Sequence, residues 1–451
     1  MFLERIEAPG LAHFSYILSS QGSAVIVDPR RDIDVYTDML AARGWKATAI
    51  LETHIHADFA SGARELAAAT GAPLYLSAHD RGETYQYAFP HLKLSDGEEI
   101  NIGDLRIVAC HTPGHTPEHL SFLVYEKSRC GQPLALLTGD FIFVGSLGRP
   151  DLLGEEAKRQ LAHQLYRSVH ERISTLPDFL MIYPAHGAGS FCGANLSDRS
   201  ITTLGYERFC NIFMTDQPED RFVEEILTSV PEFPDYYRRM KALNSAGAPI
   251  LGQLPGQDDL AVADFERLVS AGATIVDLRP AHQFGAGHIP GSLNIGAGSG
   301  FGLWAPWVVP PDKPVAFVGH ATEEARRALV RVGVDDLRGT LHGGFEAWQQ
   351  AKLPVATIPQ IELNQLGGRT LLDVRSSAEF ARSHAPSAVS MPLGRVASQI
   401  ANLAGPVAVV CGSGYRSAIV ASLLKQAGLE DVANVAGGMA AAPPQQSRAS
   451  A

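Results

Sequence analysis

The stretch at residues 53–62 reads THIHADFASG and follows the apolar run ATAILE at 47–52, which is typical of a buried strand. His54, His56 and Asp58 occupy alternate positions, so two imidazoles and one carboxylate come together where the strand ends. Local hydrogen bonding in a polar loop explains such an isolated segment equally well. Whether this segment forms part of a metal site therefore depends on further histidines and acids elsewhere in the chain.

Three later segments carry the same kinds of residue at strand-to-turn junctions. They place His115 in TPGHT, Asp140 in LTGD and His186 in YPAHG. Residues this far apart meet only where the fold brings several strand ends to one edge, as a layered α/β protein does. The four segments together predict a metal site at such an edge.

In this order, the motifs resemble those of the metallo-β-lactamase superfamily over roughly the first half of the chain. The resemblance implies an αββα sandwich, in which two β-sheets pack face to face with helices outside. Dinuclear hydrolases of this superfamily, including the glyoxalase II type, have a histidine directly after the aspartate, and here that residue is Phe59. A phenyl ring cannot ligate, so a single metal is expected.

The spacing of the motifs leaves the identity of this metal open. One possibility is zinc held by three histidines, and the other is mononuclear iron held by His54, His115 and Asp140 with open positions for O2 and substrate. The loop GRPDL at 148–152, taken with THIHADF and AHGAGSFCG, further resembles the bacterial persulfide dioxygenases. That resemblance implies one non-haem Fe(II) per chain on His54, His115 and Asp140.

The same resemblance leaves His56, Asp58 and His186 to orient the ligands or to remain from a lost second metal site. Arg149 is expected to hold a substrate carboxylate by a bidentate pair, or else to pair with the neighbouring acid at the surface. Cys192 could lie beside the metal and relay sulfur, or could be an inert buried cysteine.

Composition narrows the class of protein. The chain has 451 residues, 45% of them hydrophobic and 19% charged, which is typical of a soluble protein with two or three domains. Its net charge of −11 argues against a nucleic-acid-binding surface. We find no membrane-length apolar run and no leader-like start, so we expect a cytoplasmic protein. Five cysteines do not form a disulfide framework in a chain of this size.

The second half of the chain repeats itself. TIVDLR at 274–279 recurs as TLLDVR at 370–375, and HIPGS at 288–292 recurs as HAPSA, both 96 residues later. Matching motifs at one offset indicate a duplicated domain, and the alternation of strand and helix in each copy predicts parallel sheets wrapped by helices. The order Asp-x-Arg, His-x-Pro-Gly and Gly-Gly-Phe resembles the rhodanese, or sulfurtransferase, domain.

The second copy carries a reactive loop. The strand VAVV at 407–410 is followed by CGSGYRS at 411–417, which turns backbone N–H groups toward Cys411 at a helix N-terminus and favours its thiolate. We predict Cys411 as the nucleophile that accepts sulfane sulfur, with Arg416 as a second catalytic residue. The predicted substrate-binding residues of this loop are Gly412, Ser413, Gly414, Tyr415 and Ser417.

The first copy lacks this chemistry. Aligning the two apolar strands puts Gly319 opposite Cys411 and Glu324 opposite Arg416. A glycine cannot act as a nucleophile and an acid repels sulfur anions, so this copy is predicted to be catalytically silent, a spacer or a docking domain. Trp304 and Trp307 in an apolar stretch could contact a neighbouring domain, although core packing is the default.

These features predict a persulfide dioxygenase domain at 1–245, a silent rhodanese-like domain at 258–355, an active rhodanese domain at 358–440 and a disordered tail at 441–451. Fe(II) would oxidise a thiol persulfide with O2 to sulfite and thiol, and Cys411 would pass sulfane sulfur to sulfite, giving thiosulfate. The expected small-molecule partners are the persulfide of glutathione or a related thiol, O2 and sulfite. We expect binding neither to nucleic acid nor to a membrane. We also expect the chain to form a homo-oligomer.

Two other functions compete with this hypothesis. One is a glyoxalase II-type (hydroxyacylglutathione) metallo-hydrolase that cleaves a thioester with metal-bound hydroxide, against which Phe59 counts. The other is a carrier or binding protein that only passes or senses persulfide. The set of His54, His115 and Asp140 argues against the carrier.

Overall fold

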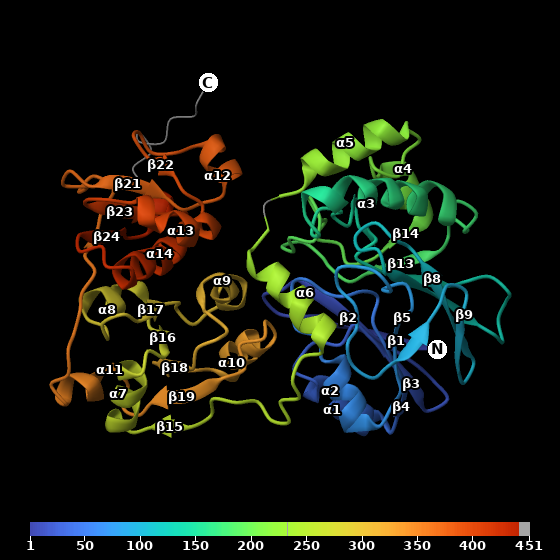
Figure 1. Ribbon diagram of the computed structural model, residues 1–451, viewed down its shortest axis with the longest axis horizontal. Coiled ribbons are helices and arrows are strands. Elements are labelled where there is room, and N and C mark those ends of the chain that lie inside the picture. The colour runs from blue at the N-terminus through green and yellow to red at the C-terminus, as the bar shows by residue number, and fades with distance from the viewer. Residues whose placement is uncertain (232, 442–451) are drawn as a thin grey trace. The chain divides into compact units, whose positions relative to one another are not determined.

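Contacts within the chain divide it into two compact units, residues 1–252 with 330–333 and residues 253–329 with the chain from 334 onward (Figure 1). The structure is a computed structural model that describes residues 1–231 and 233–441. The predicted tail at 441–451 therefore lies, from residue 442, outside the described residues. The predicted domain boundaries stay predictions.

Two six-stranded sheets form the first unit. The first sheet has the order β1-β2-β3-β4-β5-β6, made of Phe2–Ala8, His13–Ser20, Ser23–Val27, Lys46–Leu51, Leu74–Ser77 and Leu92–Leu94. The second has the order β14-β13-β10-β9-β8-β7, made of Thr202–Thr203, Met181–Pro184, Ala135–Gly139, Leu120–Glu126, Leu105–His111 and Glu99–Ile102. A hairpin of β11 (Ile142–Phe143) and β12 (Ser146–Leu147) follows β10.

Alternating side chains of the strands build the core between these sheets. In β3, Val25 and Val27 belong to the inter-sheet core, whereas Ala24 and Ile26 belong to the cluster on the outer face. Phe122 and Val124 of β9 enter the same inter-sheet core from the second sheet. Because each sheet is apolar on both faces, each needs a second covering layer.

Helices supply that covering layer on both sides. Helices α1 (Asp34–Arg43) and α2 (Ala63–Thr70) pack on the first sheet. Helices α3 (Glu155–Arg167) and α5 (Glu219–Ser229), which lie side by side in Figure 1, pack on the second. The remaining helical segments of this unit are a π-helical turn (Ser168–Arg172), α4 (Leu204–Cys210) and α6 (Tyr236–Ala246). The four layers confirm the predicted αββα sandwich.

The second unit holds two five-stranded parallel sheets with the same topology, which confirms the predicted duplication. The first has the order β15-β19-β18-β16-β17, made of Asp259–Leu260, Leu337–Leu341, Val315–Val318, Thr274–Asp277 and Leu293–Asn294. The second has the order β20-β24-β23-β21-β22, made of Gln360–Ile361, Val432–Val435, Val407–Val410, Thr370–Asp373 and Val389–Ser390.

Helices follow the strands in both repeats. Those of the first are α7 (Val262–Ser270), α8 (Ala281–Ala286), α9 (Phe301–Val308), α10 (Glu323–Val330) and α11 (Gly344–Gln350). Those of the second are α12 (Ser377–Arg382), α13 (Leu393–Gln399), α14 (Tyr415–Gln426) and two 3-10 turns, Ile400–Asn402 and Gly438–Ala441. Helix α14 packs against β17, since the Ser422 hydroxyl accepts a hydrogen bond from the backbone of Asn294. Among the described residues, we find no helix with the length and apolar character needed to cross a membrane.

Candidate functional site

Three strand ends of the first unit bring the predicted metal ligands together. His54 follows β4, His115 follows β8 and Asp140 follows β10, and all three side chains are buried. Oδ2 of Asp140 lies 3.8 Å from Nε2 of His54 and 3.4 Å from Nε2 of His115. The two sheets therefore present two imidazoles and one carboxylate to a common point.

The hydrogen bonds of the two histidines determine which nitrogen faces that point. Nδ1 of His115 donates to the carbonyl oxygen of Arg149 at 2.9 Å. Nδ1 of His54 lies 2.9 Å from the Thr53 hydroxyl, which itself donates to Asp28, so Nδ1 of His54 is the donor of that pair. Each histidine therefore keeps its proton on Nδ1 and directs an Nε2 lone pair toward Asp140.

The three converging atoms lack protein partners. Nε2 of His54, Nε2 of His115 and Oδ2 of Asp140 are buried and make no hydrogen bond to any described residue. Burial lowers the pKa of both histidines well below the ordinary value, which keeps them in the neutral form that ligates. Three buried lone pairs aimed at one point are costly without a cation, so these residues fit a metal ion.

The neighbouring position, where a second metal would bind, has different surroundings. His186 lies between two carboxylates, with Nδ1 2.6 Å from Asp140 and Nε2 2.7 Å from Asp58. Burial opposes its charge, yet Asp140 and Asp58 together raise the pKa of His186 to about 10. The Phe59 ring is fully buried against His13, with ring centroids 4.0 Å apart. The phenyl ring of Phe59 cannot ligate, so Asp58, His186 and Cys192 are the described residues that offer ligand atoms at this second position.

His56 is turned away from the three converging atoms. Its Nε2 lies 3.2 Å from Asp28, the same carboxylate that accepts the Thr53 hydroxyl proton. Asp28 therefore positions the ring of His56 and also holds the Thr53 hydroxyl that orients His54.

Cys192 lies beside the second position. Its sulfur and the ligand atoms of Asp58 and His186 are all within 4.8 Å of one another, and Tyr237 Oη is 4.0 Å from Sγ. Burial, reinforced by Asp140 and Asp58, raises the pKa of the Cys192 thiol well above its ordinary value. The cysteine is thus near the site but is held as the protonated thiol.

Arg149 pairs with the neighbouring acid Asp151, as one interpretation of the sequence expected, but it does so inside the protein. It is not a surface residue, because its side chain is 1% exposed. Its Nε and Nη2 donate to Asp151 at 2.7 and 2.8 Å, and its Nη1 donates to the carbonyl oxygen of Phe191. A substrate carboxylate would have to displace Asp151 from this fork. The contribution of Arg149 that the structure shows is its backbone carbonyl, which orients His115.

Helix α6 supplies residues that the sequence analysis missed. Asn244 donates to the carbonyl oxygens of His56 and Phe59 and accepts from the backbone of Ser61. Lys241 is buried and donates to the carbonyl oxygen of Ile55 at 2.9 Å. Both side chains hold the 53–62 loop. The only signal in the sequence is a lysine and an asparagine three residues apart on the apolar face of a helix.

The loop after β23 surrounds the predicted nucleophile. Cys411 is 1% exposed, and its Sγ accepts the backbone N–H of Gly414 at 3.2 Å and lies 3.5 Å from Oγ of Ser417. Gly414 has φ +92°, a conformation that favours glycine, and caps α14. Gly412 and Ser413 form the turn between the sulfur and this cap. Of the backbone N–H groups that the sequence analysis expected around Cys411, the structure shows that of Gly414 bonded to the sulfur.

Arg416 is engaged by a carboxylate. Its Nη1 and Nη2 donate to the two oxygens of Glu379 at 2.7 Å, and this hydrogen bonding to Arg416 lowers the pKa of Glu379 to about 2. The guanidinium also lies 5.4 Å from the ring centroid of Trp304 on α9. Arg416 therefore braces the loop through Glu379, and its fork is not open to an anion in this structure.

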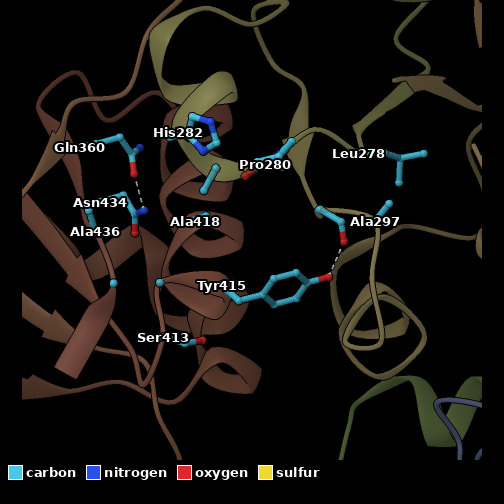
Figure 2. A pocket seen from close by; sticks show the side chains of 15 residues that line it. Leu278, Pro280, His282, Ala297, Gln360, Ser413, Tyr415, Ala418, Asn434 and Ala436 are labelled. Atoms are coloured by element: carbon cyan, nitrogen blue, oxygen red, sulfur yellow. Dashed lines mark hydrogen bonds between the residues drawn. The ribbon is translucent and has the colours of Figure 1, made fainter. Parts of the chain in front are cut away.

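The first repeat ends the equivalent strand without a thiol. Gly319 directly follows β18, as Cys411 follows β23, and has φ +92°. The first repeat instead contacts the second one, because Trp304 covers Arg416 and the Tyr415 hydroxyl donates to the carbonyl oxygen of Gly296 at 2.8 Å (Figure 2). Trp307 packs closely on Gly394. Both tryptophans therefore serve contacts between the repeats.

Two protein-family models match the chain. The metallo-beta-lactamase superfamily model matches residues 8–186, and the rhodanese-like domain model matches residues 261–351 and 360–442. A solved metallo-beta-lactamase from Staphylococcus aureus is 32% identical, with a TM-score of 0.67, and the match covers 76% of this chain and 98% of that one.

Curated relatives with two different activities match the first half about equally. A hydroxyacylglutathione hydrolase of Francisella tularensis is 29% identical over 220 residues, which is 48% of this chain and 80% of the relative. The human mitochondrial persulfide dioxygenase ETHE1 is 28% identical over 223 residues, which is 47% of this chain and 80% of the relative. Sequence identity therefore does not distinguish the hydrolase activity from the persulfide dioxygenase activity.

Gly148 offers a test of the metal site that changes no ligand. A Cβ added there would lie 1.7 Å from the carbonyl oxygen of Asp140, so Gly148→Ala must displace the backbone of that ligand. We expect metal affinity to fall by about 10–100-fold, as it does when the support of a ligand is lost. The measurement is metal per chain after dialysis against graded chelator. Gly131→Ala, whose added Cβ meets nothing within 4 Å, is the control, and equal retention in both variants would contradict this geometry.

Proposed function

Because the chain belongs to the metallo-beta-lactamase superfamily and carries two rhodanese-like domains, we propose that it is a persulfide dioxygenase coupled to a sulfurtransferase. The observation that carries the proposal is the asymmetry of the metal centre. One point collects three unpartnered ligand atoms, while the neighbouring group of Asp58, His186 and Cys192 has the phenyl ring of Phe59, which cannot ligate, beside it. A dinuclear hydrolase needs both positions, whereas a mononuclear oxygenase needs one.

The proposed ligands are two histidines and one carboxylate. His54, His115 and Asp140 would hold one Fe(II) per chain, which supplies O2 chemistry when bound and leaves coordination positions open. In the overall reaction one persulfide, one O2 and one water give one thiol, one sulfite and two protons. Burial of all three ligands keeps bulk water from the reacting sulfur, and Asp28 and the Arg149 carbonyl hold the imidazoles in register.

The proposed sulfur transfer takes place at Cys411. Its thiolate attacks the outer sulfur of a second persulfide, the S–S bond breaks, and the carrier leaves as a thiolate. Sulfite then attacks the sulfur held on Cys411, releasing thiosulfate and a proton and regenerating the thiolate. The Gly414 N–H, 3.2 Å from Sγ, would stabilise the negative charge on sulfur in both steps. Joining both activities in one chain raises the effective concentration of sulfite at Cys411.

A glyoxalase II-type hydrolase is the second candidate, favoured by the match to the hydroxyacylglutathione hydrolase. It would bind zinc and cleave a thioester with metal-bound hydroxide. Thioester hydrolysis would not use Cys411 or the loop that surrounds its sulfur. The small molecules proposed as partners, a thiol persulfide, O2 and sulfite, belong to the first candidate alone.

Two substitutions separate the proposed activities. Asp140→Ala removes a metal ligand and should abolish O2 uptake with glutathione persulfide. Cys411→Ser should leave O2 uptake intact but change the product from thiosulfate to sulfite, because the nucleophile is gone. Oxygen electrode traces and chromatography of the sulfur anions measure both effects. Cys130→Ser, at an exposed cysteine, is the control. Thiosulfate from Cys411→Ser, or O2 uptake by Asp140→Ala, would contradict the proposal.

Phe59→His tests why the centre holds a single metal. The substitution restores the histidine beside Asp58 and His186, so zinc bound per chain should rise from about one toward two as a complete second ligand set forms. Metal analysis after equilibration with excess zinc measures this, with Phe141→His, another fully buried phenylalanine, as the control. A stoichiometry that stays at about one would mean that residue 59 does not limit the metal number.

A further inference from the structure

Four residues from far along the chain belong to the first unit. Residues 330–333 lie within the range 261–351 that the rhodanese-like model matches, yet their contacts place them in the first unit. They are the last residue of α10 and the three residues that follow it. The first unit is therefore completed by residues from the sequence of the silent repeat, the one with Gly319 in the place of the nucleophile.

The backbone of Arg331 holds the loop that carries the first metal ligand. The N–H of Ala60 donates to the carbonyl oxygen of Arg331 at 2.7 Å, and Ala60 is 0% exposed. A buried N–H that loses its acceptor is costly, so the loop depends on this carbonyl to keep its position. Ala60 lies two residues after Asp58, in the same 53–62 loop as His54. The bond therefore fixes the far end of that loop.

The side chain of Arg331 is anchored on a second loop. Its side chain is 1% exposed, and its Nε and Nη2 donate to the two carboxylate oxygens of Asp32 at 2.9 and 2.7 Å. A planar bidentate pair of this kind fixes direction as well as distance. Asp32 lies four residues after Asp28, the carboxylate that holds the Thr53 hydroxyl and the ring of His56.

The two loops run against each other. The carbonyl oxygen of Pro29 accepts the N–H of Gly62 at 2.8 Å, and Arg30 forms a β-bridge with Ser61. A Cβ added at Gly62 would lie 2.1 Å from the carbonyl oxygen of Arg30, which shows how closely the two backbones approach. Arg331 joins the same two loops a further time, through its carbonyl on one and its guanidinium on the other.

Helix α6 holds residues 330–333 in place. Nη2 of Arg239 donates to the carbonyl oxygen of Val332 at 2.9 Å. Gly333 lies close to the helix, because a Cβ added there would lie 2.7 Å from Cδ2 of Leu243. The same helix carries the lysine and the asparagine that hold the 53–62 loop. The helix, the two loops and residues 330–333 therefore form one connected support.

We propose that Arg331 is a positioning residue of the metal centre. By tying Ala60 to Asp32, it keeps the two loops in register and so holds His54 in the direction that metal binding needs. The inference rests on the metal centre of the proposed function, but it does not depend on which metal binds there or which reaction follows. It gives a part of the silent repeat's sequence a task in metal retention.

The test measures metal retention in the full chain loaded with Co(II). Arg331→Leu removes the fork to Asp32, so the 53–62 loop loses one of its anchors. The rate of Co(II) loss to excess chelator should rise at least about 10-fold, as expected when the support of a ligand is removed. The visible absorption spectrum of bound Co(II), which reports ligand geometry, should change as well. A role in stability alone would leave this spectrum unaltered.

Arg279→Leu is the matched control. Arg279 also donates Nε and Nη2 to one carboxylate, that of Asp277, and its side chain is 12% exposed. The variant loses an equivalent pair in the second unit, so it should keep the Co(II) loss rate and the spectrum of the unmodified chain. Arg331→Lys keeps a cation beside Asp32 without the fork. It should fall between Arg331→Leu and the unmodified chain, and it decides the question if Arg331→Leu does not fold.

Unchanged Co(II) retention in the Arg331 variants, or equal acceleration of Co(II) loss in Arg279→Leu, would overturn the inference. Faster loss with an unchanged spectrum would assign Arg331 to stability alone and would overturn it too. Failure of the proposed function looks different. An unmodified chain that binds Co(II) and Fe(II) but consumes no O2 with glutathione persulfide contradicts the dioxygenase and leaves this inference standing. An unmodified chain that binds neither metal contradicts both.

Discussion

The first unit depends on one electrostatic constraint, the convergence of three buried lone pairs from His54, His115 and Asp140. Burial keeps both imidazoles neutral, and hydrogen bonds from Nδ1 of each ring direct the Nε2 atoms to one point. No described protein donor satisfies these atoms, so only a cation compensates the cost of burying them. The two sheets and the loops at their strand ends provide the frame in which this convergence occurs.

The surroundings of this point limit the chemistry. His186 is hydrogen-bonded to both Asp58 and Asp140, and these two carboxylates raise its pKa although burial opposes the charge. Phe59 closes the same space with an apolar ring.

In the second unit the Cys411 sulfur accepts a hydrogen bond from a backbone N–H, while Arg416 is neutralised by Glu379. In the proposed sulfur transfer, negative charge on this sulfur would therefore be stabilised by the backbone N–H of Gly414 and not by a free guanidinium.

Sequence patterns predicted the αββα sandwich, the duplicated parallel sheets and the meeting of His54, His115 and Asp140, because each motif stands at a strand end and the motifs occur in a known order. They did not predict that Arg149 is buried against Asp151, since a local Arg-Pro-Asp pattern does not report how deeply a loop is covered. They also missed Asn244 and Lys241, because helical periodicity identifies a buried face but not what lies opposite. The place of residues 330–333 in the first unit depends on contacts between segments far apart in the sequence, which no single motif encodes.

The central claim is that one metal centre in this chain uses O2 to oxidise a persulfide. Anaerobic metal analysis of the purified protein, followed by O2 uptake on addition of glutathione persulfide, tests it most directly. The account predicts about one iron per chain, with O2 consumed and sulfite or thiosulfate formed. Bound zinc with no O2 uptake, accompanied by thioester hydrolysis, would contradict it and assign the chain to the hydrolases.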